Sequence, residues 1–173
     1  SRKDFPQALA NEGLFILPIK NRFYKILEGD GFHSLDDLPK EEVKVFTSKI
    51  GFKLKTSEYG KSESRFLDIT INTGLIEEFT GISPLYLTIR GRKYSPKEGF
   101  IFKFGKEISE VRGVQVEVDA GFEGEDAIVL VEAKGERLNS FNIRQLYYPY
   151  RFWGIESEKE IINIFFWHEE KSD

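Results

Sequence analysis

Residues 114–121 read Val-Gln-Val-Glu-Val-Asp-Ala-Gly, and residues 127–134 read Ala-Ile-Val-Leu-Val-Glu-Ala-Lys. Both runs are apolar enough to form strands, and the short polar turn between them predicts an antiparallel pair. Side chains on a strand alternate between its faces, so Glu132 and Lys134 point the same way. Asp119 lies near the end of the first run. We therefore expect two carboxylates and one lysine to meet at the edge of a sheet.

These side chain types indicate a particular chemistry. Mg²⁺ binds few carboxylates and keeps several waters, so two acids are enough to hold one ion. The ion can activate a water, and a lysine beside it can orient that water or stabilise charge on the phosphorus. Glu132 follows a run that is apolar at both odd and even positions, so both faces of the strand should be covered. A charge there is costly unless it is paired or metal-bound. The pattern indicates hydrolysis of a phosphodiester bond.

The chain before residue 62 predicts a β-rich extension. Leu14 to Leu27 contain two apolar runs that favour two strands. Phe52 and Leu54 alternate with lysines, which favours a strand at the end of an otherwise ambiguous segment. The expected elements are a short helix or arm at 1–13, strands within 14–28, a loop with a turn of helix at 29–40, and helix or strand at 41–58.

A helix is predicted over 62–80, with Ser62 as its cap and Gly81 as its stop. A later helix, roughly 140–153 and capped by Asn139 or Ser140, contains Pro149, which implies a kink or an early stop. Apolar and alternating runs predict the remaining strands. These are 85–89 (followed by a turn at Gly91), 100–104, the paired runs at 113–120 and 126–134, and a buried strand at 160–167.

This order of elements and its acidic motif resemble the PD-(D/E)XK nuclease superfamily, which has the restriction-endonuclease-like fold. Asp119 matches the first acid of the family, Glu132 the second and Lys134 the lysine, while Val118 stands in place of the nominal proline. The resemblance covers roughly residues 62–167. It implies an α/β (α+β mixed-sheet) core of helix, three-strand meander, helix and strand at 62–173. Residues 1–61 would be an N-terminal extension for specificity, dimerisation or packing.

The resemblance also implies a function. We expect an endonuclease that uses Mg²⁺, for which Mn²⁺ can substitute, and that leaves a 5′-phosphate and a 3′-hydroxyl. Sequence-specific cleavage of double-stranded DNA, as in type II restriction enzymes, is the favoured interpretation, and cutting both strands would require a homodimer. One alternative is a RecB-like repair or processing nuclease or a junction resolvase. Another is a non-catalytic nucleic-acid- or protein-binding domain in which the triplet is accidental.

Further residues are candidates for this site. The carbonyl of Ala133 would complete the metal ligands, and Glu77 or Glu78 could add one from the preceding helix, although a solvent-facing helix pair explains these two equally well. Gln145 lies where the RecB-like branch has a Gln-x-x-x-Tyr motif, but the fourth residue after it is Pro149. Gln145 could orient the lysine or contact phosphate. Predicted DNA contacts are Arg90, Arg92, Lys93, Arg144 and Arg151.

The composition narrows the classes of protein further. Hydrophobic residues make up 40% and charged residues 31% of the 173 residues, as in ordinary globular proteins. No apolar run approaches the roughly 20 residues of a membrane span, and no secretory leader is visible, so we expect a cytoplasmic protein. The sequence contains no cysteine, which excludes disulfides and cysteine-ligated metals. The net charge of -4 argues against nonspecific coating of nucleic acid, not against a nuclease.

Overall fold

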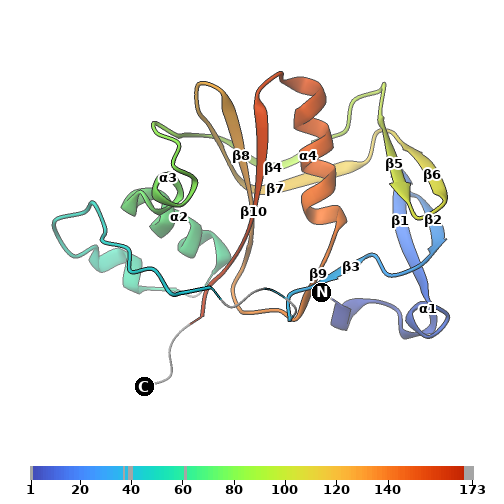
Figure 1. The fold of residues 1–173 in the computed structure, drawn as a ribbon, viewed down its shortest axis with the longest axis horizontal. Coiled ribbons are helices and arrows are strands. Elements are labelled where there is room, and N and C mark those ends of the chain that lie inside the picture. The colour runs from blue at the N-terminus through green and yellow to red at the C-terminus, as the bar shows by residue number, and fades with distance from the viewer. Residues whose placement is uncertain (1, 37, 39–40, 61, 170–173) are drawn as a thin grey trace.

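The computed structural model describes residues 2–36, 38, 41–60 and 62–169, and it shows a mixed α+β protein built around a four-stranded sheet (Figure 1). The strand order is β10-β8-β7-β4. β4, β7 and β8 pair as antiparallel neighbours, whereas β10 is parallel to β8. A parallel pair requires a crossover connection, and α4 supplies it. The bounds are Tyr86–Tyr94 for β4, Gln115–Glu123 for β7, Ala127–Lys134 for β8, Arg144–Glu156 for α4 and Glu160–Trp167 for β10.

Helices cover both faces of the sheet, which explains the continuous apolar run in β8. α2 (Glu63–Thr73) and α3 (Leu75–Thr80) place Leu67 and Ile76 against β7 and β8 on one face. α4 lies on the other side of the sheet in Figure 1, where Trp153 packs against Ile128 and Leu130. All residues of β8 from Ala127 to Ala133 are buried as a result.

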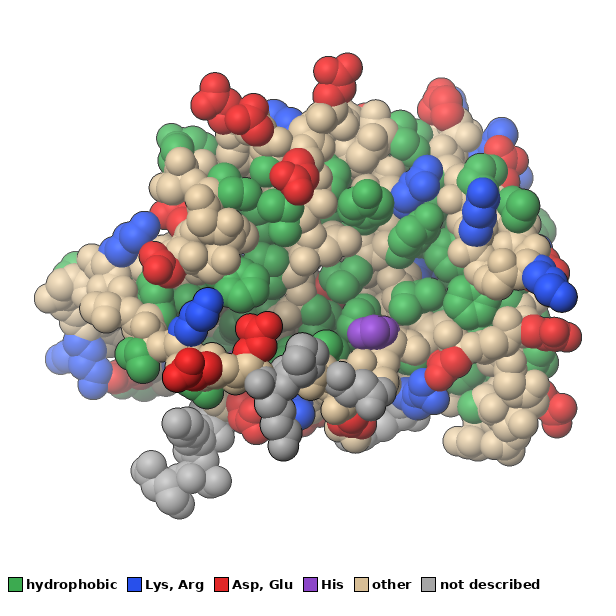
Figure 2. All heavy atoms as spheres, viewed as in Figure 1, with side chains coloured by type: hydrophobic (Ala, Val, Ile, Leu, Met, Phe, Trp, Pro, Cys, Tyr) green, Lys and Arg blue, Asp and Glu red, His purple; other side chains and the backbone are tan. Residues whose placement is uncertain are grey.

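β10 is less buried than predicted. It lies at one edge of the four-stranded sheet, and all of its residues after Glu160 are half-buried. Figure 2 shows hydrophobic side chains across the middle of the face seen in this view, with many of the charged side chains around its rim. No helix in the described part of the chain is long and apolar enough to span a membrane.

The helix predicted over 62–80 is divided into α2 and α3 at Gly74. This glycine has a φ of 80°, a left-handed conformation that ends an α-helix. The predicted cap is confirmed, because the Ser62 hydroxyl accepts a hydrogen bond from the Arg65 amide at 3.3 Å. The predicted stop is also confirmed, because Gly81 has a φ of 72° and caps α3.

Several other predictions about local structure were wrong. β4 continues through Gly91, which has a φ of 76° beside a register shift and is not a turn between strands. Residues 52–55 form no strand, and a 3₁₀ helix, η2 (Lys55–Glu58), follows instead. β5 (Phe100–Phe104) is confirmed, but its partner β6 (Glu107–Val111) was not predicted. β6 reads Glu-Ile-Ser-Glu-Val, whose two apolar residues are three apart, so it lacks the alternation that identified β5.

The last helix also differs from its prediction. Residues 140–142 form β9, which pairs with β3 (Phe32–Ser34), so α4 begins only at Arg144. Neither Asn139 nor Ser140 caps it, since its N-cap is Ile143, which makes no side-chain cap bond. The helix also continues past Pro149 to Glu156, so the early stop did not occur.

The elements before residue 29 follow the prediction and pack into the same core, whereas residues 32–34, predicted within a loop with a turn of helix, form β3. The earlier elements are η1 (Arg2–Asp4), α1 (Gln7–Asn11) and the hairpin of β1 (Leu14–Lys20) and β2 (Phe23–Glu28). Phe15 and Leu17 of β1 share a buried cluster with Tyr148 and Phe152 of α4. The Tyr148 hydroxyl donates a hydrogen bond of 2.8 Å to the carbonyl of Pro18. The hairpin is therefore attached to the helix that faces the sheet.

Replacing Tyr148 with phenylalanine should lower the free energy of unfolding by about 1 kcal/mol, because the partly buried Pro18 carbonyl would lose its hydrogen bond from this hydroxyl. Urea unfolding followed by circular dichroism measures this change. Tyr150→Phe is the matched control, since Tyr150 lies on the same helix with 43% of its surface exposed. Equal effects of the two substitutions would contradict a specific role for the Tyr148 bond.

Candidate functional site

β7 and β8 separate at the point where their carboxylates lie. They pair from Glu123↔Ile128 to Ala120↔Val131 and no further. Beyond that point β8 continues beside β10, and β7 continues beside β4. A pocket of about 520 Å³ opens at this fork, and its lining includes Asp119, Glu132 and Lys134. The structure therefore brings the three residues of the predicted motif together.

A β-bulge lies at the position of Asp119. Between the pairs Ile89↔Gly121 and Gly91↔Val118, β4 has one residue and β7 has two, Asp119 and Ala120. Asp119 nevertheless keeps the face that regular alternation predicts, because Gln115 and Glu117 line the same pocket. The Oδ2 of Asp119 accepts a hydrogen bond of 2.8 Å from the amide of Ala133 in β8. This carboxylate thus spans the gap just where the backbone ladder ends.

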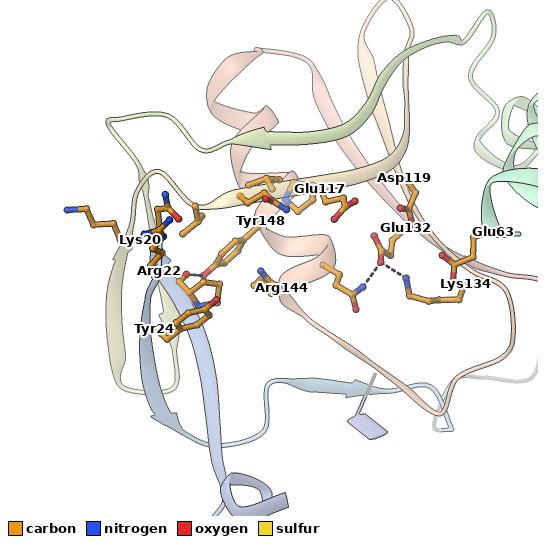
Figure 3. A pocket seen from close by; sticks show the side chains of 17 residues that line it. Lys20, Arg22, Tyr24, Glu63, Glu117, Asp119, Glu132, Lys134, Arg144 and Tyr148 are labelled. Atoms are coloured by element: carbon orange, nitrogen blue, oxygen red, sulfur yellow. Dashed lines mark hydrogen bonds and ion pairs between the residues drawn. The ribbon is translucent and has the colours of Figure 1, made fainter. Parts of the chain in front are cut away.

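Glu132 is held by two donors (Figure 3). The Nζ of Lys134 donates to its Oε1 at 2.5 Å and also lies 2.9 Å from the carbonyl oxygen of Ala133. The Nε2 of Gln145, on the first turn of α4, donates to the same Oε1. Only 10% of the Glu132 side chain is exposed. Gln145 therefore belongs to the pocket together with the acid-x-lysine triplet.

The charge of Glu132 is poorly solvated. Burial raises the pKa of Glu132 to about 7, although its hydrogen bond from Lys134 acts in the opposite direction. The negative charges of Asp119 and, less strongly, Glu63 contribute to this raised pKa. A cation placed among these carboxylates would relieve both the burial cost and the repulsion.

Glu63, which sequence reasoning missed, lines the pocket from the first turn of α2. Its Oε1 accepts a hydrogen bond of 3.1 Å from the amide of Gly135, directly after β8. The topology could have indicated it. Residues between α3 and β4 pack beside Gly124, which lies in the turn between β7 and β8. This turn is at the end of β8 opposite Lys134. The end of α3 is therefore far from the site, and the start of α2 lies nearer to it.

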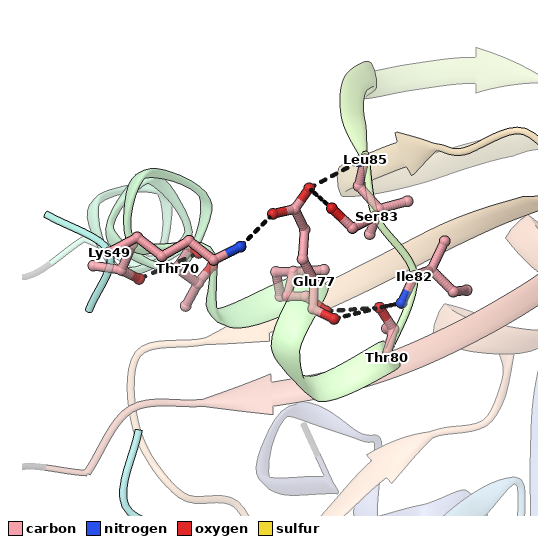
Figure 4. Close-up of polar contacts among 9 residues, drawn as sticks. Lys49, Thr70, Glu77, Thr80, Ile82, Ser83 and Leu85 are labelled. Atoms are coloured by element: carbon pink, nitrogen blue, oxygen red, sulfur yellow. Dashed lines mark hydrogen bonds and ion pairs between the residues drawn. The ribbon is translucent and has the colours of Figure 1, made fainter. Parts of the chain in front are cut away.

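Glu77, which with Glu78 was a candidate for a further metal ligand, lies outside the pocket. Its carboxylate accepts hydrogen bonds from the Lys49 ammonium at 2.9 Å, the Leu85 amide at 3.0 Å and the Ser83 hydroxyl at 3.2 Å (Figure 4). The bond from Lys49, followed by that from Leu85, lowers the pKa of Glu77. Glu77 therefore secures the connection from α3 to β4. Glu78 does not line the pocket either.

Four of the five predicted DNA contacts lie outside the pocket. Arg90 pairs with Asp68 of α2 at 2.7 Å, and Arg92 pairs with Glu117 at 3.2 Å. Lys93 is exposed on the edge strand β4. Arg151 lies with its guanidinium carbon 6.0 Å from the centre of the Phe100 ring.

Arg144 does line the pocket, beside Gln145 on the first turn of α4. Two cations that were not predicted, Lys20 and Arg22, join it from the turn between β1 and β2. Sequence reasoning missed them because the hairpin lies about a hundred residues from the motif, and only packing brings the two together.

The donor atoms suit one hard cation. Within the described ranges, no group of three or more His, Cys, Asp or Glu residues is arranged to hold a metal ion. Two carboxylates are nevertheless enough for Mg²⁺, because water and substrate oxygens complete its shell. Hydrogen bonds found in the described part of the chain use Oδ2 of Asp119 and Oε1 of Glu132 and leave Oδ1 and Oε2 without such a bond there. The Ala133 carbonyl oxygen, the third predicted ligand atom, already accepts a hydrogen bond from the Nζ of Lys134.

Comparison with known proteins gave one match. The model of a family described as a domain of unknown function (DUF6997) matches residues 27–172. No curated protein and no solved structure matches the chain.

Proposed function

Since the chain belongs to the DUF6997 family, whose description names no activity, we propose a function from the pocket: metal-dependent hydrolysis of phosphodiester bonds in DNA. The fork between β7 and β8 is the observation that carries this proposal. It directs Asp119, Glu132 and Lys134, from two neighbouring strands, into one pocket. Carboxylates and a lysine beside a hard cation are suited to phosphodiester hydrolysis.

The order of elements supports a restriction-endonuclease-like core. α2 and α3 precede β4, β7 and β8, and α4 then leads to β10, which adds to the sheet beside β8. This is the helix, meander, helix and strand order of the PD-(D/E)XK resemblance, with the β5–β6 hairpin inserted between the first two strands. The acid-x-lysine triplet lies at the end of the central strand β8.

Each residue of the pocket has a role in this proposal. Asp119, Glu132 and the Ala133 carbonyl would hold Mg²⁺, which when bound polarises the phosphate and makes water more acidic. The Ala133 amide keeps Asp119 in position, and the Nε2 of Gln145 keeps Glu132 in position. The Nζ of Lys134 lies at the same edge and can donate a hydrogen bond to the attacking water or to a phosphate oxygen.

Two substrate classes fit this site. Sequence-specific cleavage of duplex DNA by a homodimer, as in type II restriction enzymes, follows from the resemblance as a whole. The contact between Gln145 and Glu132 favours the second candidate, a RecB-like nuclease that processes DNA, because a glutamine on this helix belongs to that branch.

The test is incubation with supercoiled, linear, single-stranded and branched DNA, with Mg²⁺ and with a chelator. Discrete fragments from duplex DNA would favour restriction, and trimming from ends would favour processing. If no DNA is cut with Mg²⁺ or Mn²⁺, and calorimetry detects no binding of either ion with or without DNA, the proposal is wrong and a non-catalytic binding domain remains.

Glu63→Gln should reduce the rate of cleavage by about ten-fold, as expected for a group that supports metal ligands without being one. Glu63 contributes negative charge beside Glu132 and holds the Gly135 amide. Glu77→Gln is the matched control and should leave the rate unchanged, because Glu77 lies outside the pocket. Cleavage rates at saturating Mg²⁺ measure both. A larger loss from Glu77→Gln would show that the wrong acid has been assigned.

A further inference from the structure

The pocket at the fork has a second end, formed by the N-terminal hairpin. Lys20, Arg22 and Tyr24 line it at the β1–β2 turn, on the opposite side from Asp119 and Lys134 (Figure 3). Arg144 and Tyr148 of α4 lie between the two ends. Glu63, Asp119 and Glu132 therefore lie at one end of the pocket and Lys20 and Arg22 at the other, while Arg144 and Glu117, which pairs with Arg92, lie between them. An extended polyanion could lie along it with one phosphate at the fork and others beside the cations.

The hairpin turn has the composition of a nucleic-acid contact. Phe23 and Tyr24 are 61% and 62% exposed, and the Nζ of Lys20 lies 5.8 Å from the centre of the Phe23 ring. Among the residues that the structure describes, Lys20, Arg22 and Arg144 form no salt bridge. Lys25, by contrast, is paired with Glu107 at 2.8 Å. Unpaired cations beside exposed rings suit phosphates beside bases.

The backbone of the turn gives an independent reason to assign a function to Arg22. Lys20 pairs with Phe23, so Asn21 and Arg22 form a two-residue turn. Arg22 has a φ of 65°, and it is the one described residue other than glycine with a positive φ. Glycine is strongly favoured at such a position, and arginine there is conformationally costly. A ligand for its guanidinium would explain why arginine occupies this position.

The hairpin is held in a defined place relative to the fork. Tyr148 bonds the carbonyl of Pro18 at 2.8 Å, and the Arg112 amide bonds the carbonyl of Ile19 at 2.9 Å. Phe15 and Leu17 are buried in the core cluster below. The cations of the turn therefore have a stable separation from the carboxylates, as a site for successive phosphates requires.

We propose that the β1–β2 hairpin is the arm that holds the DNA strand being cut. Lys20, Arg22 and Arg144 bind phosphates beside the one at the fork, and Phe23 and Tyr24 stack on unpaired bases. The preferred substrate is accordingly single-stranded DNA or a duplex with a single-stranded end. Cleavage of the strand at the fork rests on the proposed nuclease function, whereas binding of the strand by the hairpin can be measured without cleavage.

The first test measures binding of a fluorescent single-stranded oligonucleotide by anisotropy, with a chelator present so that no cleavage can occur. Lys20→Ala combined with Arg22→Ala should weaken binding by about ten-fold and reduce the slope of log K against log salt by about 1.4, the value for two phosphates. The control combines Lys103→Ala with Lys106→Ala. Both are exposed lysines near the β5–β6 turn that do not line the pocket. Unchanged binding after the hairpin substitutions, or an equal loss in the control, overturns the proposal.

The second test concerns the bases. Phe23→Ala combined with Tyr24→Ala should weaken binding of the single strand by about ten-fold or more, because each stacked base contributes to affinity. Binding of a blunt duplex should change little, since its bases are already stacked. An unchanged affinity for the single strand, or the same loss with the blunt duplex, overturns the assignment of these rings. Thermal melting verifies that the variants, changed only at exposed positions, remain folded.

The two proposals can fail separately. If the hairpin substitutions weaken binding but the parent never cleaves DNA with Mg²⁺ or Mn²⁺, hydrolysis is wrong and the arm stands. If the parent cleaves DNA and the hairpin substitutions alter neither binding nor cleavage, the arm is wrong and hydrolysis stands. A parent protein that binds no oligonucleotide, with chelator or with Ca²⁺, overturns the arm directly.

Discussion

Replacing Lys134 with alanine should reduce the rate of Mg²⁺-dependent DNA cleavage by about a thousand-fold, because a donor aimed at developing charge in a buried site has an effect of this size. The Nζ of Lys134 lies at the fork between Glu132 and the Ala133 carbonyl, and 19% of its side chain is exposed. Asp119→Asn should cause a comparable loss by weakening the metal site. Single-turnover cleavage of a labelled DNA measures both.

A second lysine provides the control for Lys134. Lys159 forms a similar partly buried pair with Glu123, at 2.6 Å, but at the other end of the sheet. Lys159→Ala should therefore leave the cleavage rate unchanged while removing an ion pair of the same kind. Calorimetry with Mg²⁺ distinguishes the two roles at the fork, since Asp119→Asn should lose affinity for the ion and Lys134→Ala should retain most of it. Parent-like cleavage by Lys134→Ala would rule out its proposed role.

The second large effect is on stability. Burial raises the pKa of Glu132 from 4.5 to about 7 in the folded protein. A carboxyl group with a higher pKa in the folded state binds its proton more tightly there, so the contribution of Glu132 to the free energy of unfolding is greatest below pH 4.5. It then falls as the pH rises to about 7. The full loss attributable to this group is about 3 kcal/mol.

Glu132→Gln removes this titration. In the presence of a chelator, the parent should therefore lose up to about 3 kcal/mol relative to Glu132→Gln between pH 4.5 and pH 8. Urea unfolding at a series of pH values measures the difference. Glu123→Gln is the control, because Glu123 also pairs with a lysine but is 42% exposed. At pH 8, Mg²⁺ should stabilise the parent more than Glu132→Gln. Parallel pH profiles for parent and Glu132→Gln would contradict the assignment.

Much of the local structure could be read from the sequence, because it depends on nearby residues. The alternation in residues 114–121 and 127–134 predicted β7 and β8 as an antiparallel pair, and the structure confirms it. Ser62 and Gly81 identified the ends of a helical region, since caps act within one turn. The break at Gly74 was not foreseen, although the residue type allowed it.

Only the part of the pocket that depends on neighbouring strands could be predicted from the sequence. Asp119, Glu132 and Lys134 were found because two strands joined by a short turn must be neighbours. Glu63 lines the pocket but was not predicted, and Glu77, which was a candidate, lies outside it, because the position of a helix end over a sheet depends on how the chain enters β4. Lys20 and Arg22 were missed because no local pattern connects the hairpin with the motif.

The sequence by itself determined which residues alternate, where helices are capped, and that an acid and an acid-x-lysine triplet occupy adjacent strands. These properties follow from the covalent order of side chains over a few residues. The tertiary structure alone decided that β7 and β8 separate beside Asp119 to leave an open fork, and that a hairpin about a hundred residues away brings its cations to the same pocket. Strand separation, bulges and the docking of distant elements depend on the packing of the whole core, which is a sum of many long-range contacts.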